Sequence, residues 1–471
     1  MKKLSLVLLI CFFANISFGQ HQNIEEKPKI WGNDSNRPED TTSLLSVFKA
    51  GKINGHFRYY HSSIRNKGDL SDYQANAIGG GLRFESGNFH GLNMGLSGFY
   101  IFNVGSSDLS KKDAKSGQSN RYEIGLFDVT NPQNLNEINR VEELFIKYTK
   151  SNSKIIFGRQ LINTPFINLQ DGRMRPTAVE GLWIETTLSN KNAIQGGWLY
   201  SMAPRSTSKW YSMQSSFGLY PAGINGEGVK SDYLGNINTS GAYILNYEFN
   251  SFKNLKINLW DMWVENVMNT SLIQTDWEKK LPHGKLYSGT QITFQSKSGN
   301  GGNPDETKTY YSNNKPVIIF GGRMGWKSKK WDYSINVNRI GSSGRYLMPR
   351  EWGRDHFYTF MPRERNEGFG DVTALVGKAT FFPRQSTTLH LSYGYFSLPD
   401  VLNFELNKYG MPSYTQLNVD LRQKFSGFLN GFEGQVLWIM KWNQGETYDN
   451  PKYVIHKVNM NLLNIVVNFR F

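Results

Sequence analysis

The final stretch of the chain, VNMNLLNIVVNFRF (458–471), alternates between two kinds of side chain and ends on a phenylalanine. Every second residue from Leu463 to Phe471 is apolar, and the residues between them include Asn464 and Arg470. Because successive side chains of a β-strand point to opposite faces, this period of two predicts a strand with one apolar face and one mixed, more polar face. A strand buried in a soluble β-sandwich could show the same pattern, so other features of the chain have to separate the two cases.

The same period of two recurs along most of the chain. In KINGHFRYY, Ile53 and Phe57 fall on one face, and His56 and Arg58 fall on the other. A chain built almost wholly from such runs is typical of an all-β protein. Further runs are AIGGGLRFE (77–85), EELFIKYTK (142–150), VIIFGGRMGW (317–326), WDYSINVN (331–338), TLHLSYGYF (388–396) and YTQLNVDLRQKF (414–425).

The composition favours a membrane barrel over a soluble sandwich. Aromatic residues make up 14% of the chain, yet the mean hydropathy is −0.49. In a transmembrane β-barrel, lipid-facing apolar residues alternate with polar residues of the lumen, so the average hydropathy stays low, and tyrosine and tryptophan gather at the membrane interfaces. Bacterial single-chain barrels have even strand numbers, and roughly 25 residues per strand with its loop suggest 18 strands. We therefore predict an all-β fold, a transmembrane antiparallel β-barrel of 18 strands.

The N-terminus has the order of a secretory signal peptide. Lys2 and Lys3 precede the apolar run LSLVLLICFFA, and small residues follow that run. The domains predicted from this order are a signal peptide at 1–19, a short N-terminal extension at 20–50 and one barrel domain at 51–471.

Removal of the signal peptide would leave a mature chain without cysteine, because Cys11 is the only one. Disulfides, a thiol enzyme and a cysteine-ligated zinc site are thereby excluded, and no cofactor is expected. The formal net charge of +14 would suggest nucleic acid in a cytosolic protein. An exported chain rarely meets nucleic acid, so the basic side chains are expected to serve another anion, in the outer membrane of a Gram-negative bacterium.

Longer stretches rich in glycine, asparagine, serine and aspartate interrupt the alternation. We expect these stretches to be extracellular or inward-folded loops, because such a barrel keeps its long loops at one end and its short turns at the other. The stretches are 104–139, 161–180, 203–238, 266–282 and 298–315.

One segment, REWGRDHFYTFMPRERNEG (350–368), holds four arginines and four carboxylates among aromatic residues. A guanidinium is charged at every physiological pH and can hold a carboxylate through two parallel hydrogen bonds. On a strand, Arg363 and Arg365 would share one face about 7 Å apart, although Pro362 makes a loop or a bulge possible. The alternative interpretation is structural ion pairing.

Four segments resemble the OprD-type outer-membrane porins, also called outer-membrane carboxylate channels. The most specific is EWGRDHFYTFMPRERNEGFGDV (351–372), and GRQLINTPFINLQDGRMRPTAVEG (158–181) is similar to the constriction segment of that family. The segments 72–85 and 412–439 look like family strands. The resemblance implies an 18-stranded barrel, narrowed by an inward-folded constriction loop at 161–180. It also implies a ladder of arginine and lysine side chains that guides small carboxylate-bearing solutes.

The predicted solute-binding residues come from two sources. The resemblance indicates Arg363 and Arg365 of the arginine-rich segment, with Asp171 and Arg173 of the constriction loop. Arg354 of the same segment and Arg175, a second arginine of the loop, are added as further candidates. The alternation adds Arg58, Arg83, Arg323, Arg422 and Lys424, whose side chains are expected to face the lumen.

Other functions stay open at this point. His390 and Ser392 share a strand face, as in an outer-membrane enzyme that hydrolyses lipids, but no nucleophile motif accompanies them. A general or oligosaccharide porin fits the composition equally well, and the glycine-rich stretch 299–307 could wrap a calcium ion. The expected partners are outer-membrane lipids, small anionic solutes, and the barrel assembly machinery through Phe471, with the barrel acting as a monomer or a trimer.

Overall fold

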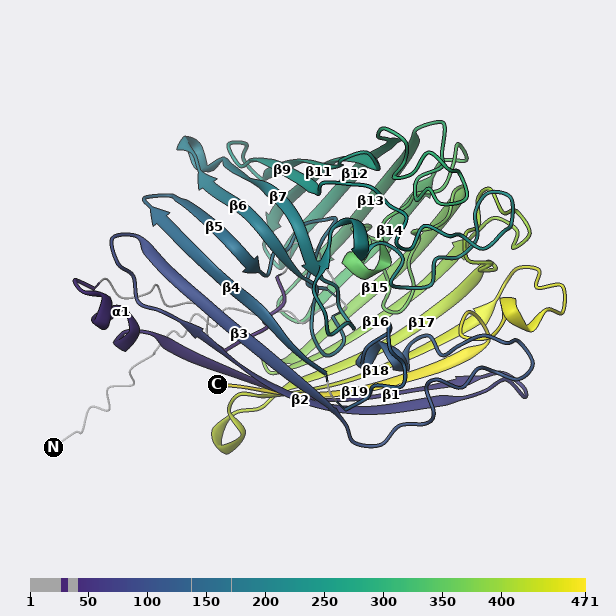
Figure 1. Ribbon diagram of the computed structural model, residues 1–471, viewed down its shortest axis with the longest axis horizontal. Coiled ribbons are helices and arrows are strands. Elements are labelled where there is room, and N and C mark those ends of the chain that lie inside the picture. Colours follow the sequence, from purple (N-terminus) through teal and green to yellow (C-terminus); the bar gives the residue numbers. More distant parts are fainter. Residues whose placement is uncertain (1–26, 33–40, 137, 171) are drawn as a thin grey trace.

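The computed structural model of the protein describes residues 27–32, 41–136, 138–170 and 172–471, and the predicted signal peptide lies outside them. Tilted strands run side by side around a closed ring (Figure 1). The first strand, β1 (Lys52–Asn66), pairs antiparallel with the last, β19 (Met460–Arg470), while other strands pair with neighbours along the chain. The sheet formed by the described residues therefore closes on itself, which removes the exposed edges of an open sheet.

The closed wall contains 18 strands, as the sequence predicted. A further two-residue strand, β8 (Tyr211–Ser212), lies against the end of β7, but β7 also pairs directly with β9, so the ring passes from β7 to β9. No helix in the described ranges is both long and apolar enough to cross a membrane. The strands of the wall are β1, β2 (Tyr73–Glu85), β3 (Leu92–Asn103), β4 (Ile138–Lys150), β5 (Ser153–Gln160), β6 (Ala178–Thr187), β7 (Ala193–Ala203), β9 (Ala242–Phe249), β10 (Leu255–Val264), β11 (Met268–Leu281), β12 (Gly284–Lys297), β13 (Val317–Lys327), β14 (Trp331–Ile340), β15 (Val372–Arg384), β16 (Thr387–Ser397), β17 (Tyr414–Lys424), β18 (Phe432–Asn443) and β19. The helical elements are α1 (Leu44–Lys49) and the short 3-10 turns η1 (Glu123–Leu126), η2 (Ser189–Lys191), η3 (Gln214–Ser216), η4 (Arg350–Trp352), η5 (Gly427–Leu429) and η6 (Pro451–Tyr453).

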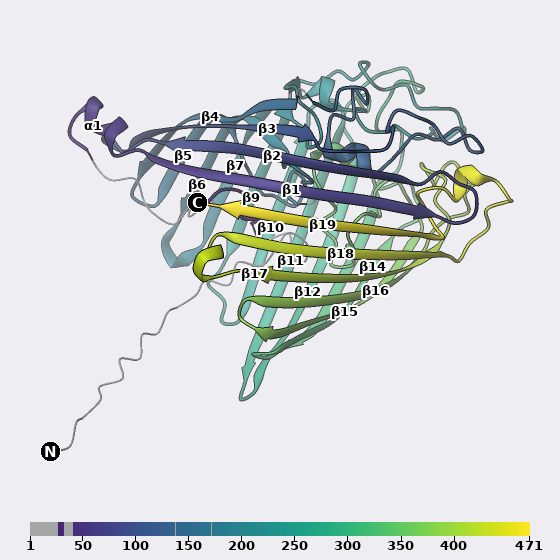
Figure 2. The ribbon, with the colours of Figure 1, turned by 90° about the horizontal axis from the view of Figure 1, so that it is seen from below.

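The two ends of the barrel differ. Short turns such as 151–152 and 282–283 join strands at the end where α1 and the C-terminus lie (Figure 2). Short turns of bacterial outer-membrane barrels face the periplasm and longer loops face outward. The long loops at the other end are 104–137, 161–177, 204–241, 298–316, 341–371, 398–413 and 444–459.

The predicted loop at 266–282 is wrong. Most of it is β11, and only residues 265–267 separate this strand from β10. Thr270 and Gln274 of β11 are buried on the inner side of the wall, whereas Ile273 is exposed on the outer side. The small polar residues that suggested a loop are the polar inner face of a strand, which a water-filled barrel tolerates.

The two faces of the wall follow the predicted alternation. On β1, Ile53 and Phe57 are 65% and 50% exposed, whereas His56 and Arg58 are 1% and 4% exposed. Aromatic stacks also lie on the outer wall towards both ends, as a membrane-interface girdle requires. They comprise Trp198, Tyr243 and Trp263 towards the long loops, and Trp326, Trp331 and Tyr333 towards the short turns.

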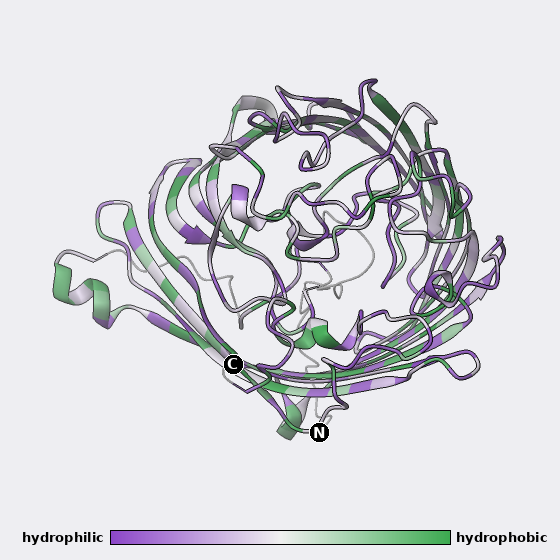
Figure 3. Ribbon diagram, turned by 45° about the vertical axis from the view of Figure 1, so that its right-hand side comes forward, coloured by the Kyte–Doolittle hydropathy of each residue, from purple (hydrophilic) through white to green (hydrophobic). Residues whose placement is uncertain are grey.

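Several long loops fold back into the barrel and cross its interior (Figure 3). Residues 344–370 of the loop between β14 and β15 are almost all buried. Trp352 and Phe357 of this loop belong to one buried apolar cluster with Phe166 of the loop between β5 and β6 and with inward side chains of the wall. The core of the protein therefore lies inside the barrel, between the inward loops and the wall.

Candidate functional site in the barrel interior

The arginine-rich segment lies in the inward loop 341–371, not on a strand. The sequence-based expectation that Arg363 and Arg365 share one strand face is therefore wrong: Pro362 precedes Arg363, whose φ is +78°. The guanidinium of Arg363 donates to Asn464 Oδ1 of β19 at 3.0 Å and to the hydroxyl of Tyr60 on β1. That of Arg365 donates to the carbonyl of Arg350 within its own loop at 2.8 Å. The two arginines thus contact different parts of the protein.

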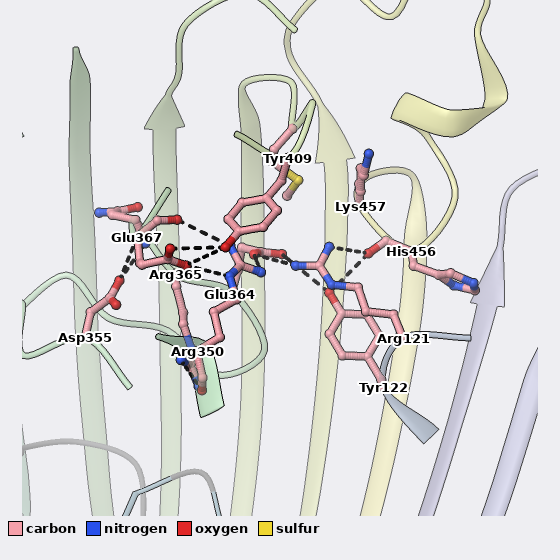
Figure 4. Close-up of polar contacts among 12 residues, drawn as sticks. Arg121, Tyr122, Arg350, Asp355, Glu364, Arg365, Glu367, Tyr409, His456 and Lys457 are labelled. Carbon is pink, nitrogen blue, oxygen red and sulfur yellow. Dashed lines mark hydrogen bonds and ion pairs between the residues drawn. The ribbon is translucent and has the colours of Figure 1, made fainter. Parts of the chain in front are cut away.

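Glu364, between these two arginines, is the centre of a buried charge network (Figure 4). Its carboxylate lies 2.9 Å from Arg121 of the 104–137 loop and 3.1 Å from Lys441 of β18. Arg350 lies further away, at 3.9 Å. Burial alone would raise the pKa of Glu364, but Arg121, Lys441 and Arg350 outweigh burial and lower the pKa to about 2. The network joins loop 341–371 to a second loop and to the wall.

Glu367 forms the second contact group of this loop. It accepts a 2.7 Å ion pair from Arg350, whose guanidinium lies 3.8 Å from the centre of the Tyr409 ring. The hydroxyl of Tyr409 donates to the same carboxylate at 3.1 Å (Figure 4). Hydrogen bonding, charge and cation–π contact therefore converge on one arginine, which holds the loop against the 398–413 loop.

Two further carboxyl groups of loop 341–371 have raised pKa values. Burial raises the pKa of Glu351 to about 7, although Glu351 accepts the backbone N–H of Gly218 at 2.8 Å. Burial likewise raises the pKa of Asp355 to about 6, against the attraction of Arg365. Both carboxyl groups therefore titrate between about pH 6 and pH 7, well above the ordinary range of a carboxyl group.

The loop between β5 and β6, the predicted constriction loop, is held by its own ion pairs. Arg175 donates to Glu142 of β4 at 2.7 Å, and Arg140 lies 2.8 Å from the same carboxylate. The guanidinium of Arg175 also lies over the rings of Trp31 and Phe99, at 4.4 and 4.3 Å. Arg175 therefore joins this loop to the wall and to the N-terminal extension.

Of the other constriction-loop residues in the prediction, Asp171 lies outside the described residues. Arg173 has a φ of +51°, and its carbonyl accepts a hydrogen bond from Arg58 of β1. The loop also meets loop 341–371: the side chain of Asn168 donates to the carbonyl of Arg354 at 3.0 Å and accepts the N–H of Arg354 at 3.0 Å. The two inward loops thus form one body inside the barrel.

The strand-borne residues of the prediction lie on the inner side of the wall. Arg83 pairs with Glu85 at 2.7 Å and Arg323 with Asp276 at 2.5 Å. Arg422 pairs with Asp420 at 2.5 Å, and Lys424, half-buried, ends the same strand. Arg83, Arg323 and Arg422 therefore each have an acidic neighbour, and Lys424 lies across from Glu433 of β18.

Arg58 differs, because the groups to which it donates are neutral. Its Nε donates to Asn468 Oδ1 at 2.7 Å, and its Nη1 donates to the carbonyl of Met174 at 3.3 Å. Asn468 is four residues from Asn464, the partner of Arg363, so the two arginines lie along β19 roughly 13 Å apart. Arg470, at the end of the same strand, extends this line and pairs with Glu433 of β18. We call Arg363, Arg58 and Arg470 the seam row.

Sequence reasoning missed several residues that organise the interior. Arg140 and Glu142 are two positions apart on one strand, so the same alternation could have placed both inside. Lys441 follows the same rule on β18. No local pattern identifies Trp31, which is buried and donates from Nε1 to Glu143 at 2.8 Å.

His390 and Ser392, considered as an enzyme pair, are both buried on the inner face of β16. The Nδ1 of His390 lies 2.9 Å from the hydroxyl of Thr380 on the neighbouring strand, which gives this histidine a structural contact.

Comparison with known proteins gives both a family and a fold. Residues 54–315 match a protein family described as outer membrane porin, OprD family. The OccAB4 structure of Acinetobacter baumannii has a TM-score of 0.69 at 15% identity and covers 93% of this chain and 100% of that chain. For Pseudomonas aeruginosa OpdK, solved with vanillate, the TM-score is 0.66 at 14% identity, covering 90% and 99%. For P. aeruginosa OccK9 (OpdG) it is 0.68 at 13%, with the same coverage. No curated protein sequence matches this chain.

Proposed function

This chain belongs to the OprD family of outer-membrane porins, and on that premise we propose that its channel conducts small carboxylate-bearing solutes along the seam row. The observation that carries the proposal is that the hydrogen-bond acceptors of Arg58, an amide oxygen and backbone carbonyls, are neutral. Neutral acceptors orient a guanidinium without cancelling its charge, so the charge can still attract an anion.

The positions of the cations, more than the total charge of the interior, would make the channel selective for carboxylates. Among the described residues, the buried side chains include eleven arginines and lysines and ten aspartates and glutamates, so the interior is almost balanced. In the seam row, the cations follow one strand from the long-loop end towards the periplasm. A solute that leaves Arg363 would meet Arg58 roughly 13 Å further on. That separation exceeds one Debye length of about 8 Å only modestly, so the two attractive regions overlap.

Weak contacts suit such a channel. A solvated ion pair contributes only ~0–1 kcal/mol, so the solute is attracted without being trapped. Even a site with a dissociation constant of 1 mM corresponds to about 4 kcal/mol, which a few such contacts can supply.

One of the compared structures supports a carboxylate as the solute. P. aeruginosa OpdK was crystallised with vanillate, which carries a carboxylate. At 14% identity this likeness concerns the fold, so the solute class of the present chain rests on its own arginines.

The test is conductance in planar bilayers, combined with liposome swelling in amino acids, other carboxylates, short peptides and sugars. We expect Arg58→Gln and Arg363→Gln to lower carboxylate flux more than the flux of neutral sugars. Arg339→Gln is the matched control, because Arg339 pairs with Asp371 at the exposed end of the wall.

Equal losses for carboxylates and sugars in the seam-row variants would contradict the proposal. Such a result would favour a general or oligosaccharide porin, for which the nearly balanced interior charge is the supporting observation.

A further inference from the structure

The outer wall contains a groove of about 630 Å³ that runs along β15. Its floor is formed by two small residues, Gly377 and Ala379. Ile335 of β14 and Tyr393 of β16 flank Gly377 directly across the strands. All four residues lie on the outward face of their strands, so the groove lies on the face of the barrel that lipid covers.

The floor of the groove is not filled by a neighbouring side chain. A Cβ placed on Gly377 would meet one atom within 4 Å, the carbonyl oxygen of Tyr393 at 4.0 Å. Gly80 of β2 differs, because a Cβ there would lie 2.7 Å from the ring of Phe57. A side chain thus covers the outward glycine at 80, whereas Gly377 lies open at the floor of the groove.

The groove ends at the aromatic group of the short-turn end. Trp331 stacks on Phe381 of β15, with ring centres 4.3 Å apart, and on Tyr333 at 5.3 Å. Aromatic side chains of this kind mark the membrane–water interface. A hydrocarbon chain in the groove would therefore place its head group beside the turn that joins β13 to β14.

That turn is basic. Lys329 and Lys330 are both exposed, and so is Arg384 at the next turn. The carbonyl of Lys330 accepts the N–H of Phe382 at 2.8 Å, so the turn lies directly against β15. Phe382 is five positions from Gly377, which corresponds to roughly 17 Å along the strand. The cations are therefore separated from the apolar floor of the groove by about this length of strand.

We propose that this groove is a binding site for one anionic phospholipid of the periplasmic leaflet. One acyl chain lies over Gly377 and Ala379, and the phosphate is held by Lys329, Lys330 and Arg384. The groove volume falls within the range of about 300–1,000 Å³ for small-molecule sites. Cations beside a membrane surface attract anionic lipids, whereas a zwitterionic head group offers no net charge to them.

Native mass spectrometry of the purified full-length barrel tests the proposal, after incubation with equal amounts of phosphatidylglycerol and phosphatidylethanolamine. We expect the unmodified protein to retain phosphatidylglycerol preferentially. The double change Lys329→Glu with Lys330→Glu should reduce that preference on the order of tenfold, because two attractive charges are reversed. Gly377→Phe should reduce retention of both lipids, because the new ring occupies the floor.

Two controls separate the site from general effects. Gly98→Phe adds the same ring to the outer wall at β3, where a Cβ would lie 3.6 Å from the nearest atom, the carbonyl oxygen of Arg140. Lys111→Glu with Lys112→Glu reverses two exposed charges in a long loop at the opposite end. Bilayer conductance establishes that each variant forms its barrel.

Unchanged retention in either groove variant would overturn the proposal, as would equal losses in a groove variant and its control. If Gly377→Phe instead separates a stable oligomer into single barrels with lipid retention unchanged, the groove is a contact between copies of this chain and not a lipid site.

Discussion

The cations of the wall and those of the inward loops behave differently. Arg83, Arg323 and Arg422 stand on strands, keep 12–17% of their side chains exposed and pair with acidic groups. In loop 341–371, Glu364 is 2% exposed and contacts cations from two other elements. These three wall cations therefore remain partly open to water, whereas Glu364 and its partners hold loop 341–371 in position.

The largest effect should come from the loop. Glu364→Gln leaves Arg121, Lys441 and Arg350 close together without their shared carboxylate. Loss of one partner from a buried ion pair typically costs about 3–5 kcal/mol. We expect a lower unfolding temperature and faster proteolysis within 341–371, measured on the purified barrel. An unchanged protease pattern would show that other contacts hold the loop.

The second effect depends on pH. Because the folded-state pKa of Glu351 is about 7, above its ordinary 4.5, the folded state binds this proton more tightly than the unfolded state does. The free energy of unfolding should therefore fall as pH rises from 4.5 to 7, by on the order of 1–3 kcal/mol. Asp355, with a pKa of about 6, acts in the same direction.

Glu351→Gln should flatten this dependence, because the amide stays neutral and keeps an oxygen for the N–H of Gly218. Glu364 does not interfere in this window, since its pKa of about 2 removes stability only as pH falls below about 4.5. Thermal unfolding between pH 4.5 and 7.5 provides the measurement. Parallel curves for both proteins would mean that Glu351 is not the titrating group.

A smaller effect, on the ratio of carboxylate to sugar flux, is expected for two arginines of the wall. Arg58→Gln should change the ratio of carboxylate to sugar flux by up to about fivefold, the factor that corresponds to ~1 kcal/mol. Arg422→Gln should change it less, because Asp420 already partners Arg422. Swelling rates in the two solutes decide the order, and a larger change for Arg422→Gln would reverse our ranking of the two positions.

The smallest effect should come from the end of loop 341–371. Arg339 and Asp371 form an ion pair with about half of each side chain exposed, at 45% and 46%. Asp371→Asn should cost only ~0–1 kcal/mol of unfolding free energy, because water already solvates both groups. Compared with Glu364→Gln, this variant measures how far burial, rather than charge itself, fixes the loop.

The barrel could be predicted from the sequence because the alternation of side chains along a strand depends only on neighbouring residues. A period of two determines which side of a strand each residue takes, and the inward position of Arg58 and the outward position of Phe57 follow directly. The same rule failed at 266–282, where polar inner residues such as Thr270 and Gln274 resemble those of a loop.

The interior could be predicted only in part. The arginine-rich segment was identified, but its path through the barrel depends on partners far away in the chain, such as Arg121 and Lys441 for Glu364. Glu142 became the partner of Arg175 through a similar long-range contact. Periodicity carries no information about such contacts, because they depend on how the loops pack after the wall has closed.

Closure of the wall between β1 and β19 also sets the order of events in biogenesis. His56 contacts Asn468, which lies 412 positions later in the sequence. Translation must therefore reach the final residues before β1 can pair with β19. Contacts this remote make folding slow, and an unpaired strand edge invites aggregation in the meantime. A premature stop codon that removed only β19 would leave β1 and β18 without their shared neighbour, so the whole ring would stay open.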